Sequence, residues 1–276
     1  MPESKKPKMK AAEKIEAVDG VSELPEEDKK VEEVIEKELR PERDFDKPWK
    51  RESPDERTAR ETRERLDRWV PKTQLGKDVL AGKIKNIQEI FESGMKIMES
   101  EIVDKLLDLK VDLLNIGQSK GKFGGGKRRA WRQTQKKTKE GNIPTFSVMS
   151  VVGDGQGHIG VGYGRAKETL PAKEKSIRQA KLNIKKIERG CSSYDCSCQE
   201  LHSIPITTKG KCSSVTVKLM PAPQGTGLVA NDELKKILRL AGIKDIYTQT
   251  AGKTRTTINT VKACVQALDK LSEIKV

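Results

Sequence analysis

Residues 151–168 read VVGDGQGHIGVGYGRAKE, and this stretch decides how the middle of the chain folds. Thr145–Val152, which leads into it, is rich in β-branched and apolar residues, as strands are. Asp154-Gly155 is typical of a hairpin turn, and HIGVGYGRA alternates in the way that a returning strand does. The sequence therefore predicts a β-hairpin that turns at Asp154-Gly155.

The glycines of this hairpin also match a dinucleotide-binding pattern, because Gly155, Gly157 and Gly160 have the spacing GxGxxG. Such a site needs a helix directly after the glycines, with its N-terminus facing the pyrophosphate. Residues 159–164 instead alternate like a strand and are too rich in glycine for a helix. We interpret the glycines as part of a tight hairpin that another backbone, or RNA, approaches closely.

Other signs of catalysis are weak. AGKTRTT, at residues 251–257, resembles the end of a phosphate loop, but Tyr247 stands where such a loop requires glycine. The two histidines, His158 and His202, lie near no GxSxG motif. We therefore predict that the protein is not an enzyme, with no catalytic residues and no small-molecule substrate.

Outward from the hairpin, apolar periodicity predicts a compact α+β unit over about residues 100–190. Leu170–Ile187 fits an amphipathic helix after the hairpin, and Val111–Ile116 fits a strand before it. Short helices are expected around Ile84–Phe91 and Ile102–Leu109. Residues 118–141 have no hydrophobic periodicity and are predicted to form a loop.

A second unit with the order β-β-α-β-α follows. We expect a hairpin of Ser203–Thr208 and Ser214–Met220 around Lys209-Gly210, a helix capped by Asn231 or Asp232 and ended by Gly242, a strand at Lys244–Gln249 and a helix at Thr257–Leu271. This order predicts an open sheet with helices packed on it. The general rule for crossovers favours a right-handed connection there.

The N-terminal part has a different composition. Residues 1–60 are rich in Lys, Glu, Asp and Pro and bury too little apolar surface to fold alone, although Glu26–Leu39 and Thr58–Trp69 have helical character. We divide the chain into a charged, mostly disordered extension (1–70), an RNA-binding α+β domain with preceding helices (71–190), a cysteine-bearing connector (191–202) and a C-terminal α+β domain (203–276).

The net charge of +14 is unevenly placed. Residues 1–70 hold 18 basic and 21 acidic residues, which leaves 37 basic and 20 acidic residues for the part that is predicted to fold. An excess of this kind repels itself and is usually offset by a polyanion; the alternative is an ordinary basic domain. The chain has no apolar run of the roughly 20 residues that a membrane span needs and no secretory signal, so we expect an intracellular protein without membrane contact.

The most specific chemical signal is the segment from Lys120 to Lys139, which holds nine basic residues and no acid. Its glycines keep the backbone thin, its guanidinium groups suit phosphates, and its aromatic residues can stack on unpaired bases. A solvated basic loop is the alternative. With two basic residues at the end of the glycine hairpin, the candidate RNA-binding residues are Lys120, Lys122, Phe123, Lys127, Arg128, Arg129, Trp131, Arg132, Lys136, Lys137, Lys139, Arg165 and Lys167.

The cysteines form a looser pattern, Cys191-x4-Cys196-x-Cys198-x3-His202, with Cys212 ten residues further on. Zinc takes four nitrogen or sulfur ligands in a tetrahedron, and two CxxC pairs would be the clearest sign of it. Three thiolates with His202 or Cys212 would complete such a site. The alternative is a set of unliganded thiols in a connector.

The stretch VVGDGQGHIGVGYGRAKE resembles the glycine-rich hairpin of the small-subunit ribosomal protein five family. LHSIPI at 201–206, KGKCSSVTVKLMPAPQGTGLVA at 209–230 and LAGIKDIYTQTAG at 240–252 resemble the second domain of that family almost without gaps. RGCSSYDCSC at 189–198, and the helical residues 73–109, are similar to its archaeal form. The resemblance covers about residues 70–276.

The resemblance implies an N-terminal domain like a double-stranded-RNA-binding domain and a C-terminal domain with a left-handed βαβ crossover. It also implies a cytoplasmic protein of the small ribosomal subunit that binds small-subunit rRNA near the mRNA entry channel and supports assembly and decoding accuracy. Ribosomal proteins four, eight and three of the small subunit are the implied neighbours. KGKFGGGKRRAWRQTQKK, at residues 120–137, is longer and more basic than the bacterial loop at that place, so individual contacts do not transfer.

Three functional hypotheses result. The first is a structural ribosomal protein, the second a free-standing RNA-binding regulator, and the third a nucleotide-dependent enzyme. A ribosomal protein should remain with the small subunit after a moderate salt wash, and an enzyme of the third kind should bind nucleotide.

Overall fold

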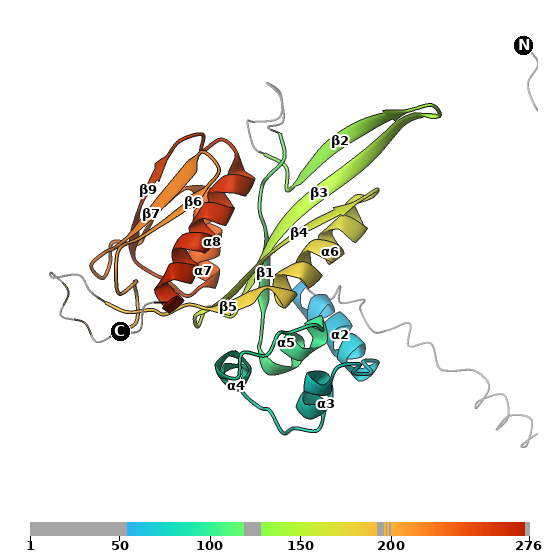
Figure 1. Cartoon of the computed structure of the whole chain (residues 1–276), viewed down its shortest axis with the longest axis horizontal. Coiled ribbons are helices and arrows are strands. Elements are labelled where there is room, and N and C mark those ends of the chain that lie inside the picture. Colours follow the sequence, from blue (N-terminus) through green and yellow to red (C-terminus); the bar gives the residue numbers. More distant parts are fainter. Residues whose placement is uncertain (1–53, 119–127, 192–195, 197, 199, 274–276) are drawn as a thin grey trace, which may run out of the picture. The chain divides into compact units, whose positions relative to one another are not determined.

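The computed structural model describes residues 54–118, 128–191, 196, 198 and 200–273, which contain two β-sheets with helices packed on them (Figure 1). The first sheet has the order β1-β3-β4-β5, with β2 also paired to β3, and consists of β1 (Lys110–Leu113), β2 (Trp131–Thr138), β3 (Gly141–Gly153), β4 (His158–Ala166) and β5 (Ile184–Lys186). The second sheet has the order β6-β7-β9-β8 and consists of β6 (Thr208–Cys212), β7 (Val215–Pro221), β8 (Leu228–Val229) and β9 (Ile246–Ala251). The predicted α+β class is confirmed.

The glycine-rich hairpin forms as predicted, because β3 and β4 pair antiparallel with Val151 opposite Val161. A strand follows the glycines, so the arrangement lacks the helix that a dinucleotide site needs. The backbone that approaches the glycines is that of α6 (Thr169–Leu182). A Cβ atom on Gly162 would overlap the carbonyl oxygen of Ser176 and the backbone nitrogen of Ala180. The glycines of β4 therefore permit a close contact between helix and sheet.

Two boundaries in the first unit differ from the sequence-based prediction. The helix predicted to continue to Ile187 ends at Leu182, and β5 follows it and pairs with β4. Ile184 and Ile187 are buried, but Ile184 lies in the short edge strand β5 and Ile187 directly follows it. The helix was predicted too long because two apolar residues three positions apart fit a helix or a strand equally well. The helix α2 (Pro54–Asp67) lies inside the segment predicted to be a mostly disordered extension.

The helices before the first sheet form a small cluster of their own. They are α2, α3 (Gln74–Leu80), α4 (Ile87–Glu92) and α5 (Ser100–Leu106), and apolar side chains of α3, α4 and α5 make a second core together with Ile184 of β5. Trp69 packs against this core and donates a hydrogen bond from Nε1 to Glu99 Oε2 (2.8 Å). The fold therefore begins before residue 71. Lys181 on α6 pairs with the buried Asp104 on α5 (2.6 Å), which joins this cluster to the first sheet.

The second unit contains the predicted strands and helices in the predicted order, but it has one additional strand and its first strand lies further along the chain. The first strand was expected at Ser203–Thr208, but β6 begins at Thr208 and includes Lys209 and Gly210. Thr208–Cys212 carries little apolar character, so the more apolar preceding segment gave the stronger signal. Two helices, α7 (Asp232–Leu240) and α8 (Thr257–Glu273), complete the unit. Of the two predicted N-cap residues, Asn231 and Asp232, Asn231 is the N-cap of α7.

The two-residue strand β8 was not predicted; it directly follows residues 221–227 and pairs parallel with β9. β8, α7 and β9 therefore form a βαβ crossover, whose left hand stays a prediction. The two sheets share a core, since side chains of both belong to one buried cluster that includes Met149, Val151, Ile159, Val217, Leu219 and Leu268. None of the helices in the described part of the chain has the length and apolar character needed to traverse a bilayer.

Candidate RNA interface and cysteine cluster

The second half of the predicted basic loop is a strand. Residues 131–138 form β2, which pairs with residues 141–148 of β3, and the prediction of a loop over 118–141 is therefore wrong for this part. Residues 141–145 of β3 pair with β2 alone, so this end of the hairpin extends past β4 (Figure 1). We call residues 131–146 the outer hairpin. Its sequence lacks alternation because most of its side chains on both faces are exposed.

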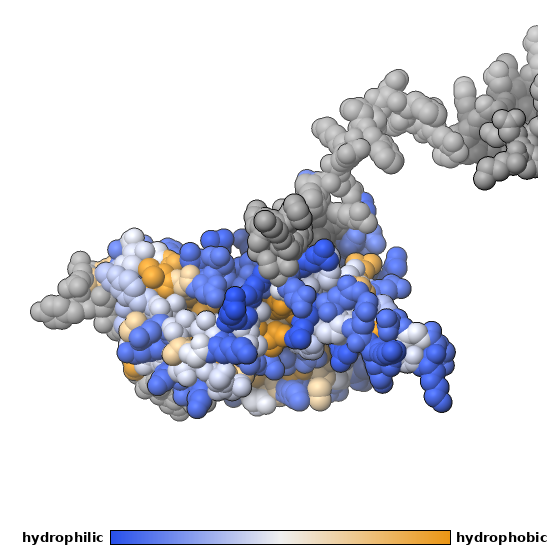
Figure 2. Space-filling view, turned by 90° about the horizontal axis from the view of Figure 1, so that it is seen from above, coloured by the Kyte–Doolittle hydropathy of each residue, from blue (hydrophilic) through white to orange (hydrophobic). Residues whose placement is uncertain are grey.

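The structure places most of the predicted RNA-binding residues on the surface. The described members of the set are all exposed: Arg128, Arg129, Trp131, Arg132, Lys136, Lys137, Lys139, Arg165 and Lys167. Lys120, Lys122, Phe123 and Lys127 lie outside the described residues. Figure 2 shows that the face seen from above is largely hydrophilic, with apolar residues in small separate areas.

The pairing register divides these residues between the two faces of the first sheet. Arg132 lies opposite Ser147, and Ser147 lies opposite Arg165, so the two arginines share a face, two strands apart. Trp131 lies opposite Val148, which pairs with Gly164 on the face that α6 covers. Neighbouring residues of a strand point to opposite faces, so Trp131 points away from the side of Arg132.

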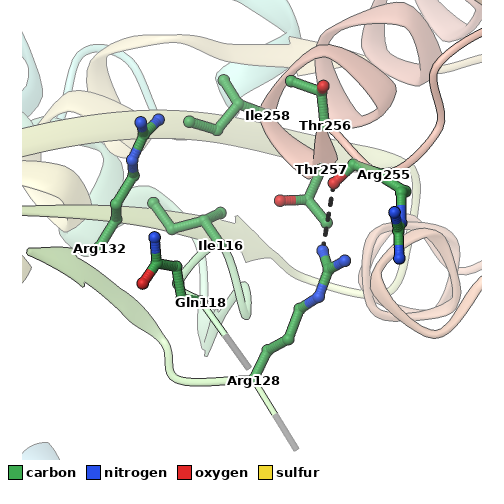
Figure 3. A pocket seen from close by; sticks show the side chains of 9 residues that line it. Ile116, Gln118, Arg128, Arg132, Arg255, Thr256, Thr257 and Ile258 are labelled. Atoms are coloured by element: carbon green, nitrogen blue, oxygen red, sulfur yellow. Dashed lines mark hydrogen bonds between the residues drawn. The ribbon is translucent and has the colours of Figure 1, made fainter. Parts of the chain in front are cut away.

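Three arginines line a pocket of about 380 Å³ at the start of β2, with Arg132 on one side and Arg128 and Arg255 on the other (Figure 3). Arg128 and Arg132 come from the predicted basic segment, whereas Arg255 comes from the turn before α8. The described residues that line the pocket are Ile116, Gly117, Gln118, Arg128, Arg132, Arg255, Thr256, Thr257 and Ile258, and no carboxylate is among them. Arg128 Nη1 donates a hydrogen bond to the Arg255 carbonyl oxygen (3.3 Å).

The pocket combines positive charge with hydrogen-bond donors. No salt bridge to Arg128, Arg132 or Arg255 is found within the described residues. The N-terminus of α8, at Thr257, adds the positive end of a helix dipole. Sequence reasoning missed Arg255, because AGKTRTT was considered only as a phosphate loop. The run of Lys, Thr and Arg in this stretch could have indicated an anion-binding residue. Nothing in the local sequence, however, links it to the segment of Arg128 and Arg132, more than a hundred residues away.

The predicted metal ligands also come together. The Sγ atoms of Cys191, Cys196 and Cys198 and a ring nitrogen of His202 all lie within 4.8 Å of one another. His202 Nε2 is 3.3 Å from Cys191 Sγ and 3.4 Å from Cys196 Sγ. Cys198 Sγ is 3.5 Å from Cys191 Sγ and 2.8 Å from Cys196 Sγ. The alternative fourth ligand, Cys212, does not belong to this cluster.

The other ring nitrogen of His202 faces Asp245. The imidazole is fully buried, and its Nδ1 lies 2.9 Å from Asp245 Oδ2. The two atoms are within ion-pair distance, and Nδ1 has no hydrogen-bond partner among the described residues. Asp245 Oδ1 accepts a hydrogen bond from the Gly227 backbone (2.7 Å), which fixes the carboxylate.

The contact between two of the thiols shifts their pKa values in opposite directions. The hydrogen bond from the Cys198 side chain, helped by backbone N–H groups of Cys198 and Gln224, lowers the pKa of Cys196 to about 6. The same contact with Cys196, with burial second, raises the pKa of Cys198 to about 12. The direct contact between the two sulfur atoms therefore favours the thiolate at Cys196 and the thiol at Cys198.

The comparisons with known proteins agree with this architecture. Residues 130–188 match the family described as Ribosomal protein S5, N-terminal domain, and residues 210–275 match Ribosomal protein S5, C-terminal domain. The chain is 50% identical over 212 residues to the small ribosomal subunit protein uS5 of Nanoarchaeum equitans, covering 76% of this chain and 91% of that protein. The uS5 protein of Staphylothermus marinus is 48% identical over 207 residues (75% and 90%), and that of Methanobrevibacter smithii 43% over 211 residues (76% and 92%).

Proposed function

The chain belongs to the uS5 family of small ribosomal subunit proteins, and we propose that it acts as a structural component of that subunit by binding small-subunit rRNA. RNA binding is supported above all by the pocket that Arg128, Arg132 and Arg255 line, in which the described lining residues include no carboxylate. Positive charges gathered around one pocket repel one another, and an anion bound in the pocket reduces that repulsion. The phosphates of an RNA backbone supply that anion.

The chemistry of the pocket fits a phosphate of irregular RNA. Guanidinium groups bind phosphate through two parallel hydrogen bonds, and Thr256 and Thr257 offer hydroxyl donors beside them. The pocket takes residues from the start of β2 and from the turn before α8. A phosphate held there would contact both structural units, so binding would also fasten the two units to each other.

The outer hairpin supports the same proposal. A two-stranded hairpin alone is marginally stable in water, and little apolar surface is buried on this one. Lys136 and Lys137 are exposed on opposite faces of β2, so the strand presents positive charge in both directions. A groove in folded RNA would surround such an arm with phosphates, and Trp131 would offer a surface on which a base can stack.

The location of the protein in the small subunit, its neighbours and its role in translation are inferred from the family resemblance. We propose that the protein lies near the mRNA entry channel, next to ribosomal proteins four, eight and three, and that it supports subunit assembly and decoding accuracy. A photo-crosslinking amino acid in place of Trp131 should react with rRNA close to that channel. Crosslinks confined to other parts of the subunit would contradict the location and leave RNA binding intact.

The direct test is rRNA affinity measured against salt concentration. Each lost phosphate contact should lower the slope of log affinity against log salt by roughly 0.7–0.9. The triple substitution Arg128→Gln, Arg132→Gln, Arg255→Gln should therefore flatten the slope by about two to three units. A triple variant of exposed lysines before the first sheet, Lys77→Gln, Lys85→Gln and Lys96→Gln, has the same change in net charge and is the matched control.

The control separates a specific contact from general attraction. If both triple variants flatten the slope equally, net charge alone explains binding and the pocket is not a phosphate site. Co-sedimentation tests the ribosomal part separately. The wild-type protein should stay with the small subunit after a moderate salt wash, whereas a free-standing RNA-binding regulator would be released.

A further inference from the structure

We propose that Cys191, Cys196, Cys198 and His202 bind one zinc ion, which fixes the connector between the two sheets. Zinc prefers thiolate and imidazole ligands in a tetrahedron, and this cluster offers three sulfur atoms and one nitrogen. Four protein ligands leave no open position for water or substrate, which is typical of a structural site. The site is independent of the arginine pocket, since the two have no residue in common.

The distances suit an ion of this size. With bonds of about 2.3 Å to sulfur and 2.0–2.1 Å to nitrogen, neighbouring ligand atoms of a tetrahedral site are about 3.5–3.8 Å apart. Three of the four measured contacts, those of His202 Nε2 with two thiols and that between Cys191 and Cys198, lie between 3.3 and 3.5 Å. The Cys196–Cys198 contact is shorter, at 2.8 Å. Coordination to one ion would move these two sulfur atoms apart.

The surroundings of His202 point to a ligand on Nε2. A histidine bound to metal through Nε2 carries its proton on Nδ1, and that N–H is usually directed at a carboxylate or carbonyl group. Here the buried Nδ1 faces Asp245 Oδ2 at 2.9 Å, and Asp245 is held in turn by Gly227. The chain thus supplies the second layer of contacts as well as the four ligands.

The remaining cysteines show how an unliganded thiol behaves in this protein. Cys264 is fully buried in the shared core, where burial raises its thiol pKa to about 12 and it packs as a small apolar side chain. Cys191, Cys196 and Cys198 are only partly buried, and they surround a histidine nitrogen instead of apolar groups. Apolar packing therefore does not explain why these three meet.

The ion would act on the connector that joins β5 to β6. Gly190 and Ser203 already exchange two backbone hydrogen bonds of 2.9 Å, and the His202 carbonyl oxygen accepts from the backbone of Lys244 (2.8 Å) and Asp245 (3.1 Å). Cys191 and His202 lie directly inside the Gly190–Ser203 pair, so a shared ion would close the loop between them. Free energy of metal binding would then stabilise the connector against opening.

The first test measures metal in the full-length protein, purified under reducing conditions without chelators. Elemental analysis should find about one zinc per chain, and Cys198→Ser should lose most of it while Cys212→Ser retains it. Cys212 is the matched control because it is a partly buried cysteine of the same region outside the cluster. Refolding with Co²⁺ should give the visible absorption of a tetrahedral site with sulfur-to-cobalt charge transfer.

The second test addresses Asp245, which we regard as a positioning residue. Asp245→Asn keeps the shape of the side chain and the acceptor for Gly227 but removes the charge, and zinc affinity measured by chelator competition should fall about 10–100-fold. Unchanged affinity would remove Asp245 from the proposal. Wild-type protein without zinc, iron in place of zinc, or a Cys196–Cys198 disulfide in the reduced preparation would each overturn the site. The wild-type measurement decides this even if a variant fails to fold.

Discussion

The strand β3 belongs to two hairpins that differ in almost every physical respect. Its residues 147–153 are buried and pair with β4, and we call residues 147–166 the inner hairpin. Its first residues, 141–143, are exposed and pair only with β2 in the outer hairpin. The inner hairpin has α6 on one face and the shared core on the other. The outer hairpin has neither.

The two turns differ in the same way. At the inner turn, Asp154 Oδ1 accepts hydrogen bonds from the backbone of Gln156 (2.7 Å) and His158 (3.1 Å), and Oδ2 pairs with the His158 ring (2.5 Å). The outer turn has an exposed hydrogen bond from Thr138 Oγ1 to the Gly141 carbonyl (2.7 Å). One strand can therefore be a core element and a surface arm, because burial depends on what covers each segment.

The largest effect should come from the glycines of the inner hairpin. Gly162→Ala should lower the free energy of unfolding by about 3 kcal/mol, because its Cβ would overlap backbone atoms of α6 that cannot move without shifting the helix. Denaturant unfolding measures this. Gln135→Ala, on the exposed strand β2, is the control and should change stability by less than about 0.5 kcal/mol. Equal losses would mean that the two hairpins do not differ in packing.

The inner turn should show a smaller and pH-dependent effect. Burial would raise the pKa of Asp154, but hydrogen bonds from the His158 ring and the backbone of Gln156 and His158 outweigh it, so the pKa lies below the usual 3.8. This stabilisation is present above pH 3.8 and is lost as the pH falls through the lowered pKa. Asp154→Asn should cost about 2 kcal/mol at neutral pH.

The measurement for this variant is unfolding free energy at several pH values. The difference between wild type and Asp154→Asn should shrink as the pH falls below 3.8, because protonation removes the charge in the wild type as well. A difference that stays constant with pH would show that the carboxylate charge contributes nothing to the turn.

In the outer hairpin the effects should appear in RNA binding. Trp131→Ala should weaken rRNA affinity by about 1–3 kcal/mol, the usual contribution of one stacked base. The salt slope should stay the same, because stacking displaces no counterions. Affinity titrations at two salt concentrations check both statements. A flatter slope would mean that the substitution also disturbs neighbouring phosphate contacts.

The smallest change in stability is expected for the lysines of β2. Lys136→Gln with Lys137→Gln should leave the free energy of unfolding within about 0.5 kcal/mol of wild type, since both side chains are exposed. The salt slope of rRNA binding should fall by about 1.5 units if both contact phosphate. A stable protein with an unchanged slope would limit RNA contact to the arginine pocket.

Much of the fold could be predicted from local patterns. The inner hairpin, the N-cap at Asn231 and the final helix were found because turn residues, capping residues and apolar periodicity are properties of short segments. The strand β2 was missed for the opposite reason, because an arm exposed on both faces has no alternation. The end of α6 and the start of β6 were predicted wrongly because they depend on which strand the neighbouring segment pairs with. Local periodicity carries no information about such pairing.

The sequence by itself determined the family, the α+β class, the excess of positive charge and the set of residues able to bind phosphate or metal. These depend on residue types and short spacings. Only the tertiary structure decided that Arg255 joins Arg128 and Arg132, that Trp131 lies on the opposite face, and that His202 rather than Cys212 completes the cysteine cluster. Such choices depend on contacts between residues far apart in the chain, which form only when the two sheets pack on their shared core.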